Sequence, residues 1–263
     1  ALGAQEILMP SLQPKSNWQQ TGRWETYATL FRFESFYSKI EYALGPTHEE
    51  IVTPLVKKFF SSYKELPRQV FQIQNKFRDE KRAKSGLLRG REFLMKDLYS
   101  FHLDDTDLDR FYEAAKKSYE RIFKQVGLGE KTYFTFASGG TFSQYSHEFQ
   151  TVCETGEDTI YICGACGVAV NEEIIGEQNI CPQCGSKDLK AAKAIEVGNI
   201  FKLKTKFSRA FDLSVTDEKG KPREVLMGCY GIGLTRLMGT TAEVASDDKG
   251  LVWPASIAPF QVH

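Results

Sequence analysis

Residues 71–101 read FQIQNKFRDEKRAKSGLLRGREFLMKDLYSF and predict two strands joined by a basic loop. The runs 70–77 and 92–101 alternate as strands do, and Gly86 and Gly90 permit tight turns between them. The loop 78–91 contains the cations Lys81, Arg82, Lys84, Arg89 and Arg91. Such a hairpin could present guanidinium forks to a polyphosphate. A solvated basic tip is the alternative, because charge runs are usually just solvated.

The composition is that of a packed globular protein without net charge. The chain has 263 residues, 41% of them hydrophobic, and 34 Lys and Arg balance 34 Asp and Glu. Zero net charge disfavours a dedicated nucleic-acid coat protein, and no apolar run approaches the roughly 20 residues of a membrane span. Six cysteines without a signal segment indicate a reducing compartment, so we expect a cytoplasmic protein without a membrane partner. The first and last residues suggest a piece of a longer protein.

The remaining pattern predicts an α+β fold, an antiparallel sheet flanked by helices, because the strands return by hairpins. A hairpin over 30–44 is expected to precede a helix that reaches about Tyr63. Thr47 would cap this helix, and Glu50 would complete a capping box. Its buried face would comprise Ile51, Leu55, Phe59 and Phe60. We also expect a helix over 104–126, strands at 5–9, 132–137, 147–153, 195–203, 212–215 and 223–229, and a strand, glycine turn and helix over 228–239.

Two CxxC pairs predict a closed metal site. The pairs are Cys163 with Cys166 and Cys181 with Cys184, and each is followed by glycine. This spacing is typical of a four-cysteine zinc ribbon. Four thiolates leave no open coordination position, so the expected Zn²⁺ is structural. A degenerate knuckle without metal and a pair of disulfides are the alternatives, and a reducing compartment disfavours the second.

Together the motifs resemble those of class II aminoacyl-tRNA synthetases, specifically the bacterial type of prolyl-tRNA synthetase. FRDE at 77–80, followed by Arg89-x3-Phe93-x3-Asp97, resembles class II motif 2. GIGLTR at 231–236 resembles motif 3, and residues 3–10 resemble the tail of motif 1. GPTHEE, QIQNKFRDE, GLLRGREFLMKD, SHEFQ and GCYGIGLTR are together highly specific for the prolyl enzymes. The resemblance runs in order over nearly the whole chain.

The resemblance implies a proline–tRNA ligase that uses ATP with Mg²⁺. The catalytic residues would be Arg78, which bridges the α-phosphate and the proline carboxylate, and Arg236, which holds the γ-phosphate. The implied ATP contacts are Arg78, Glu80, Arg89, Phe93, Glu196 and Arg236. The implied proline contacts are Thr47, Glu49, Arg78, Met95, Gly198, Asn199 and Phe201. Relatives more often have His where this chain has Asn199. Without the resemblance, Thr47 and Glu49 would be only a helix cap and a first-turn acid.

The resemblance also implies a division of the chain and a set of partners. Residues 1–160 and 191–256 would form the catalytic core, 161–190 the zinc-ribbon insertion, and 257–263 the start of an anticodon-binding domain. The partners would be L-proline, ATP and tRNA(Pro), and the full-length protein would be a homodimer. Common bacterial relatives have a large editing domain where this chain has the cysteine module. We therefore expect no editing of mischarged alanine in the same chain.

Three other interpretations stay open at this point. A non-catalytic paralogue that acts as a binding or regulatory subunit would tolerate loss of Arg78, Glu49 or Arg236, and all three are present. A zinc-ribbon nucleic-acid module with a degenerate core is disfavoured by zero net charge and intact motifs. A seryl- or threonyl-type synthetase shares the fold, but the threonyl type would need an open zinc site with Cys and His ligands.

Overall fold

The computed structural model describes residues 2–260, which divide into two compact units. The first unit comprises residues 2–113 and 202–231, and the second comprises residues 114–201 and 232–260. The chain passes from one unit to the other within α4 (Asp105–Gln125), β11 (Leu189–Lys204) and β14 (Leu226–Gly233). No helix among the described residues is long and apolar enough to cross a membrane.

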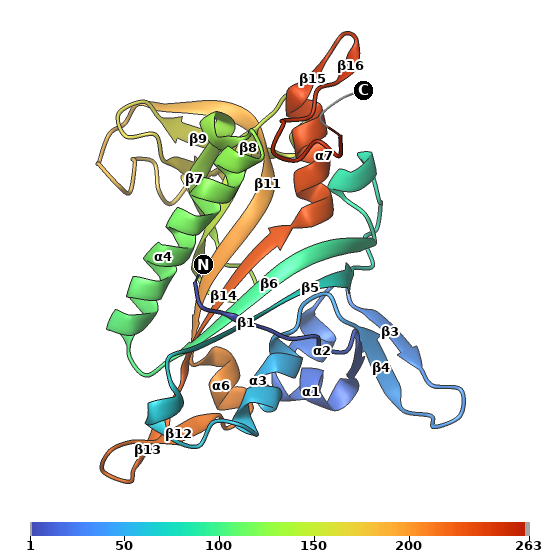
Figure 1. Ribbon diagram of the computed structural model, residues 1–263, viewed down its shortest axis with the longest axis vertical. Helices are drawn as coiled ribbons and strands as arrows, with labels where there is room; N and C mark the ends of the chain where they lie inside the picture. Colours follow the sequence, from blue (N-terminus) through green and yellow to red (C-terminus); the bar gives the residue numbers. More distant parts are fainter. Residues whose placement is uncertain (1, 261–263) are drawn as a thin grey trace. The chain divides into compact units, whose positions relative to one another are not determined.

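The first unit is built on β5 (Arg68–Phe77) and β6 (Glu92–His102), which confirm the predicted hairpin. The two strands pair antiparallel from Arg68↔Phe101 to Phe77↔Glu92. β1 (Gln5–Glu6) pairs with β5 in parallel, and β14 lies beyond β6 (Figure 1). Directly opposite residues of an antiparallel pair share one face. Lys76 and Gln72 therefore share a face with their opposite residues Phe93 and Asp97.

Short helices and two small sheets complete this unit. The helices α1 (Lys15–Gln20), α2 (Arg23–Thr26), α3 (Glu49–Lys57) and α6 (Lys206–Ala210) lie together in Figure 1. β2 (Leu12–Pro14), β4 (Glu41–Leu44) and β3 (Phe31–Glu34) form one sheet, and β12 (Ser214–Thr216) pairs with β13 (Pro222–Glu224) in another. 3₁₀ turns occur at η1 (Tyr63–Glu65) and η2 (Gly86–Leu88). The hairpin expected over 30–44 is thus confirmed, whereas the strand expected over 223–229 is divided between β13 and β14.

The predicted start of α3 was wrong. His48, not Thr47, occupies the N-cap position, and no side chain caps the first turn. The Thr47 hydroxyl donates to the Glu49 carboxylate instead of accepting from the backbone. Glu50 accepts from Arg23 and not from the cap backbone, so no capping box forms. The capping rule failed because Glu50 is bound by Arg23 and the Thr47 hydroxyl is bound to Glu49, so neither side chain is available to the backbone at the helix end.

The predicted end and buried face of α3 were also wrong. The helix ends at Lys57 rather than near Tyr63, and Phe59 is 68% exposed. The buried side chains are Glu49, Glu50, Val52, Thr53 and Val56. The apolar pattern failed because α3 buries a polar network whose residues a hydrophobic count cannot select.

Pro54 lies inside α3 without breaking it. Proline has no N–H, so the carbonyl four residues before it loses its helical donor. That carbonyl belongs to Glu50, and the Asn17 side chain donates to it at 2.8 Å. An amide from α1 thus replaces the missing backbone hydrogen bond.

The second unit contains the strands β11, β8 (Tyr145–Val152), β7 (Thr132–Ser138), β10 (Ala169–Asn171) and β9 (Asp158–Cys163), in this order. β10 pairs with β7 in parallel, whereas β10 with β9, β11 with β8 and β9, and β7 with β8 pair antiparallel. With β1 and β5 also parallel, the fold is mixed rather than purely antiparallel as predicted. The strand expected at 195–203 extends back to Leu189, because its first half pairs with β9 and its second half with β8.

Two predicted helices are confirmed. The second half of α4 packs on the sheet of the second unit, where the rings of Tyr119 and Phe123 lie 5.3 and 5.2 Å from that of Phe149. α7 (Leu234–Ala245) follows β14 at the glycine-rich turn, as expected. The remaining elements are η3 (Gly129–Lys131), α5 (Glu172–Ile175) and a hairpin of β15 (Ser246–Asp247) with β16 (Gly250–Leu251). The anticodon-domain start expected over 257–263 lies partly outside the described residues.

Candidate functional site

Two adjacent buried carboxylates begin helix α3 in the first unit. Glu49 and Glu50 are 0% exposed. Arg23 donates to both oxygens of Glu50 at 2.8 and 3.1 Å, whereas its Nη1 lies 3.9 Å from Glu49 Oε2. The aromatic rings of Trp18 and Tyr27 lie 5.2 and 5.0 Å from the guanidinium carbon. Burial raises the pKa of Glu50, and the charge of Arg23 opposes that rise.

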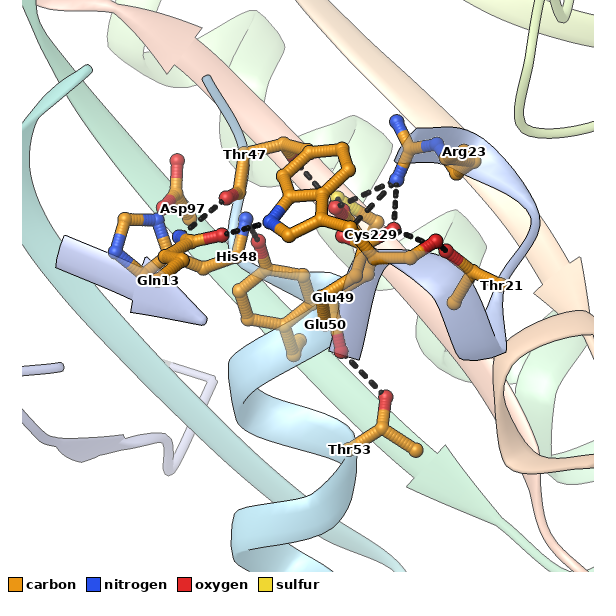
Figure 2. A network of polar contacts seen from close by, with 12 residues as sticks. Gln13, Thr21, Arg23, Thr47, His48, Glu49, Glu50, Thr53, Asp97 and Cys229 are labelled. Carbon is orange, nitrogen blue, oxygen red and sulfur yellow. Dashed lines mark hydrogen bonds and ion pairs between the residues drawn. The ribbon is translucent and has the colours of Figure 1, made fainter. Parts of the chain in front are cut away.

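Glu49 has weaker contacts than Glu50. The Thr47 hydroxyl donates to Oε2, and the Cys229 thiol donates to Oε1 at 3.2 Å (Figure 2). Burial, followed by the charge of Glu49, raises the pKa of Cys229 well above its ordinary value, so the thiol stays protonated and donates. Glu49 thus combines full burial with neutral hydrogen-bond donors. A buried carboxylate in such surroundings is suited to a cationic ligand.

The backbone around Thr47 is held from several sides. The Gln13 side chain donates to the Thr47 carbonyl at 2.9 Å, and Trp18 Nε1 donates to Gln13 at 2.9 Å. The His48 amide donates to the Tyr99 hydroxyl at 3.2 Å. These contacts come from β2, α1 and β6, and they fix the position from which Glu49 projects.

A second buried network lies next to this backbone. Lys76 is fully buried, contacts the Asp97 carboxylate, and places Nζ 2.6 Å from His48 Nδ1. His48 Nε2 lies 3.2 Å from the Pro10 carbonyl, so Nε2 carries the proton and Nδ1 accepts from Lys76. Burial, followed by the charge of Lys76, lowers the pKa of His48 to about 3. The imidazole is therefore neutral and connects β5 to the chain before β2.

The expected phosphate-binding arginine lies at the loop end of the β5–β6 hairpin. Arg78 follows β5, and its guanidinium carbon lies 5.0 Å from the centre of the Phe93 ring. Beside it, Arg89 lies 3.6 Å from Glu80. Met95 is two residues from Phe93 and points to the same face of β6. The first unit therefore brings the implied nucleotide residues Arg78, Glu80, Arg89 and Phe93 together, and Lys76 on the same face contacts the Thr47–Glu49 segment through His48.

Three expected residues of the second unit form another group. Arg236 Nη1 lies 3.2 Å from Glu196 Oε2, and Asn199 Nδ2 donates to Glu196 Oε1 at 3.1 Å. An irregularity in the pairing of β11 falls between Glu196 and Gly198. The ring of Phe201, a fourth expected residue, lies 4.8 Å from that of Phe142.

The sequence interpretation missed one residue of this group, Glu148. It accepts from Gln150 at 2.9 Å, from Asn171 at 3.0 Å and from Asn199 at 3.4 Å. Burial, followed by the charge of Glu196, raises the pKa of Glu148 to about 8. The motif SHEFQ contained this residue, but a charged residue within an otherwise buried strand was the only signal for it.

The four cysteines of the second unit are clustered. Their sulfur atoms all lie within 4.8 Å of one another, and the pairs Cys163–Cys184 and Cys166–Cys181 are 3.6 and 3.5 Å apart. Tetrahedral zinc with bonds of about 2.3 Å requires sulfur atoms roughly 3.8 Å apart. Both knuckles have the same backbone: the Gly167 amide donates to Cys163 O and the Gly185 amide to Cys181 O, with φ of +75° and +74°. The donor set therefore fits a structural zinc ion.

Backbone amides also act on the cysteine thiols. Burial would raise the pKa of Cys163, but the amides of Cys166 and Ala165 and the thiols of Cys184 and Cys181 lower this pKa to about 6. The pKa values of Cys166 and Cys184 are raised in spite of their backbone amide donors, because the neighbouring thiols share the protons of the cluster. Amides that favour the thiolate are expected of a metal knuckle.

Comparison with known proteins decides the family. Residues 31–245 match the family described as "tRNA synthetase class II core domain (G, H, P, S and T)". The chain belongs to the class II tRNA synthetase core family. The matched range includes the β5–loop–β6 hairpin and all of β14 and α7.

Relatives of this class II core agree with the prolyl type. A rat (Rattus norvegicus) protein named probable mitochondrial proline–tRNA ligase is 44% identical over 269 residues, covering 100% of this chain and 55% of that protein. The proline–tRNA ligase of Pelotomaculum thermopropionicum is 32% identical over 413 residues, covering 99% of this chain and 72% of that protein. The chain thus spans little more than half the length of the rat relative.

A solved structure shares the fold of this class II core. The structure of Giardia lamblia prolyl-tRNA synthetase in complex with prolyl-adenylate matches with a TM-score of 0.78 and 21% identity. The match covers 98% of this chain and 46% of that one. The predicted class II fold is confirmed by this likeness and by the family match.

The cysteine cluster predicts metal content. We expect about one zinc per chain, and Cys181→Ser should lose it and unfold at a lower temperature, because structural zinc contributes directly to folding. Metal analysis and thermal denaturation test this. Cys153→Ser is the control, since Cys153 lies outside the cluster. Disulfides between the four cysteines in the protein kept under reducing conditions would contradict the assignment.

The raised pKa of Glu148 predicts a pH dependence of stability. The folded protein keeps a proton on Glu148 between the ordinary value of 4.5 and about 8, where the unfolded chain releases it. The free energy of unfolding should therefore fall as pH rises through this range, by up to about 1.4 kcal/mol per pH unit. Urea denaturation at several pH values should show a shallower fall for Glu148→Gln. Equal slopes for both proteins would show that Glu148 titrates normally.

Proposed function

We propose that the chain is the catalytic core of a proline–tRNA ligase. It would activate L-proline with ATP to prolyl-adenylate and pyrophosphate, and then transfer proline to the 3′ end of tRNA(Pro). The observation that carries the proposal is Glu49, a fully buried carboxylate with neutral donors, in contact with Thr47 at the start of α3. The rat and Pelotomaculum relatives, named as proline–tRNA ligases, support the same activity.

Glu49 and Thr47 would receive the amino group of proline. The secondary ammonium of proline carries one positive charge and two N–H donors, and a buried carboxylate offers the matching charge. Thr47 would then accept or donate beside it. Met95, Gly198, Asn199 and Phe201 would complete the contacts to proline, as the family resemblance implies.

Activation would depend on positioning and electrostatics rather than on a general base. The proline carboxylate is itself the nucleophile and would attack the α-phosphorus in line, with pyrophosphate as the leaving group. Arg78 would bind the α-phosphate and the carboxylate, and Arg236 the γ-phosphate. Phe93 would stack on adenine, with Glu80 and Arg89 beside the nucleotide. Mg²⁺ bound with ATP would neutralise phosphate charge, and Glu196 is the residue that would help to hold it.

In this proposal the cysteine module occupies the place in the chain where common bacterial relatives have an editing domain, and it does not edit. The alignment with the Pelotomaculum relative extends over 413 residues, although this chain has only 263. That relative therefore has additional residues within the aligned region that have no counterpart in this chain. The alignment with the rat relative spans only 269 residues. A proline pocket cannot strongly reject alanine, because missing methylenes change binding by only about 1–3 kcal/mol. Alanyl-tRNA would then be cleared by a separate hydrolase or tolerated.

The remaining assignments concern the whole protein. Residues 161–190 would be the zinc-ribbon insertion between the core segments 1–160 and 191–256, and an anticodon-binding domain would begin at 257–263. The full-length protein would act as a homodimer. Its compartment would be reducing, as the free thiols require: the cytoplasm, or the mitochondrion if it resembles the rat relative in location.

Arg78→Ala should reduce proline-dependent ATP–pyrophosphate exchange by about 10²–10³-fold or more, because a bidentate donor to developing phosphate charge is lost. Arg78→Lys should restore little activity, since an ammonium has no guanidinium fork. Arg68→Ala at the exposed start of the same strand is the control and should keep full activity. Exchange at a near-normal rate in Arg78→Ala would refute the assignment.

Glu49→Gln should raise the KM for proline by about 10²-fold and leave the KM for ATP nearly unchanged, because only the ammonium loses its counter-charge. Exchange kinetics with each substrate varied in turn measure this difference. Glu41→Gln, at the exposed ion pair with Lys15, is the matched control. Equal effects on both substrates would count against a proline-specific role.

A further inference from the structure

Asn171 connects the cysteine module to the rest of the second unit. It ends β10, between the two CxxC pairs in sequence, and is 5% exposed. Its Nδ2 donates to Glu148 Oε2 at 3.0 Å. Its Oδ1 accepts from the Glu173 amide at 3.1 Å and so caps α5. Both ends of this side-chain amide are therefore fixed.

The contact continues from Glu148 through Asn199. Glu148 is 8% exposed and its second oxygen, Oε1, lies 3.4 Å from Asn199 Nδ2. The same Nδ2 donates to Glu196 Oε1 at 3.1 Å. Gln150 steadies Glu148 from the side, because its amide donates to Glu148 at 2.9 Å and to Asp158 of β9 at 2.8 Å.

The last contact reaches the motif 3 arginine. Glu196 Oε2 accepts from Arg236 at 3.2 Å, and the two side chains are 30% and 26% exposed. The series therefore runs from a buried amide in the module to a half-exposed guanidinium. Asn199 and Arg236 hold different oxygens of Glu196, so the orientation of its carboxylate is set by both.

We propose that Asn171 is a positioning residue, through which the cysteine module orients Glu196 and Arg236 for ATP. The inference rests on the proposed function, because it assigns these two residues to the nucleotide. Without the Asn171 donor, Glu148 keeps Gln150 as its donor on Oε2 and is free to turn from Asn199. Asn199 then no longer holds Glu196 in one orientation. The module thus contributes to nucleotide binding without touching the nucleotide.

Metal binding by the four cysteines would help to hold Asn171 in this position. Cys163 ends β9, and its amide donates to the Val168 carbonyl at 2.8 Å, immediately before β10. β10 pairs with both β9 and β7. A metal held by the knuckles would therefore fix the strand that carries Asn171.

The test compares KM values in ATP–pyrophosphate exchange by the full-length protein. Asn171→Ala removes the donor and the α5 cap, whereas Asn171→Asp keeps a cap oxygen and replaces the donor with a carboxylate oxygen that faces Glu148. Both should raise the KM for ATP about tenfold, with the KM for proline and the zinc content unchanged. Gln178→Ala is the control, because this amide lies in the same module but makes an exposed bond to the Ile180 carbonyl.

Each outcome of this test is decisive. An unchanged KM for ATP in both variants, or equal rises for ATP and proline, would overturn the inference. Loss of zinc in Asn171→Asp would also overturn it, since the residue would then act only on the module's fold. Absence of proline-dependent exchange in the unaltered protein would instead refute the proposed function. A double variant with Glu148→Gln should raise the KM for ATP no further than either change alone, because both act in one series.

Discussion

The first unit depends on one buried guanidinium placed against two adjacent carboxylates. Arg23 satisfies Glu50 through two short hydrogen bonds and reaches Glu49 only at 3.9 Å. Burying two carboxylates with one cation is costly unless each is hydrogen-bonded. Arg23 compensates the burial of Glu50 more fully than that of Glu49, and this difference separates the roles of the two carboxylates. Glu50 is a structural anchor, while Glu49 keeps capacity for a cation from outside the protein.

In the second unit a buried carboxyl group is held by side-chain amides, whereas in the first unit it is held by a guanidinium group. Glu148 is surrounded by the side-chain amides of Gln150, Asn171 and Asn199, and its raised pKa reflects the burial that they accompany. Neutral donors orient a carboxylate without balancing its charge. Both units therefore hold a buried carboxyl group in a fixed direction: Glu49 in the first unit, and Glu148, which keeps its proton up to about pH 8, in the second. Direction is what a site that works by positioning requires.

Local patterns predicted the parts of this fold that follow from local physics. Alternation in 70–77 and 92–101 located β5 and β6 to within two residues at each end. It did not identify the buried face, because residues 97–102 of β6 are all buried and the buried side of β5 carries Gln72 and Lys76. The CxxC spacing predicted the clustered sulfurs, since each knuckle is a short turn. The helix α4 was recognisable from its start signal and its apolar face.

The remaining features depend on partners distant in sequence. Thr47 met every local condition for an N-cap, yet its hydroxyl found the Glu49 carboxylate. The apolar face assigned to α3 was wrong because Arg23, 27 residues from Glu50 in sequence, draws the opposite face inward. Glu148 escaped notice for the same reason, as its donors come from β8, β10 and β11. No window of neighbouring residues contains these contacts.

The proline within α3 has a consequence for assembly. Its missing amide is replaced by Asn17, so the helix is complete only when α1 is docked against it. An isolated segment 49–57 would lack the Asn17 donor to the Glu50 carbonyl in its first turn, and a helix this short is not stable alone. The buried start of α3 is thus not a preformed local motif. It forms only when α1 packs against α3, so α3 is expected to fold together with the rest of the first unit.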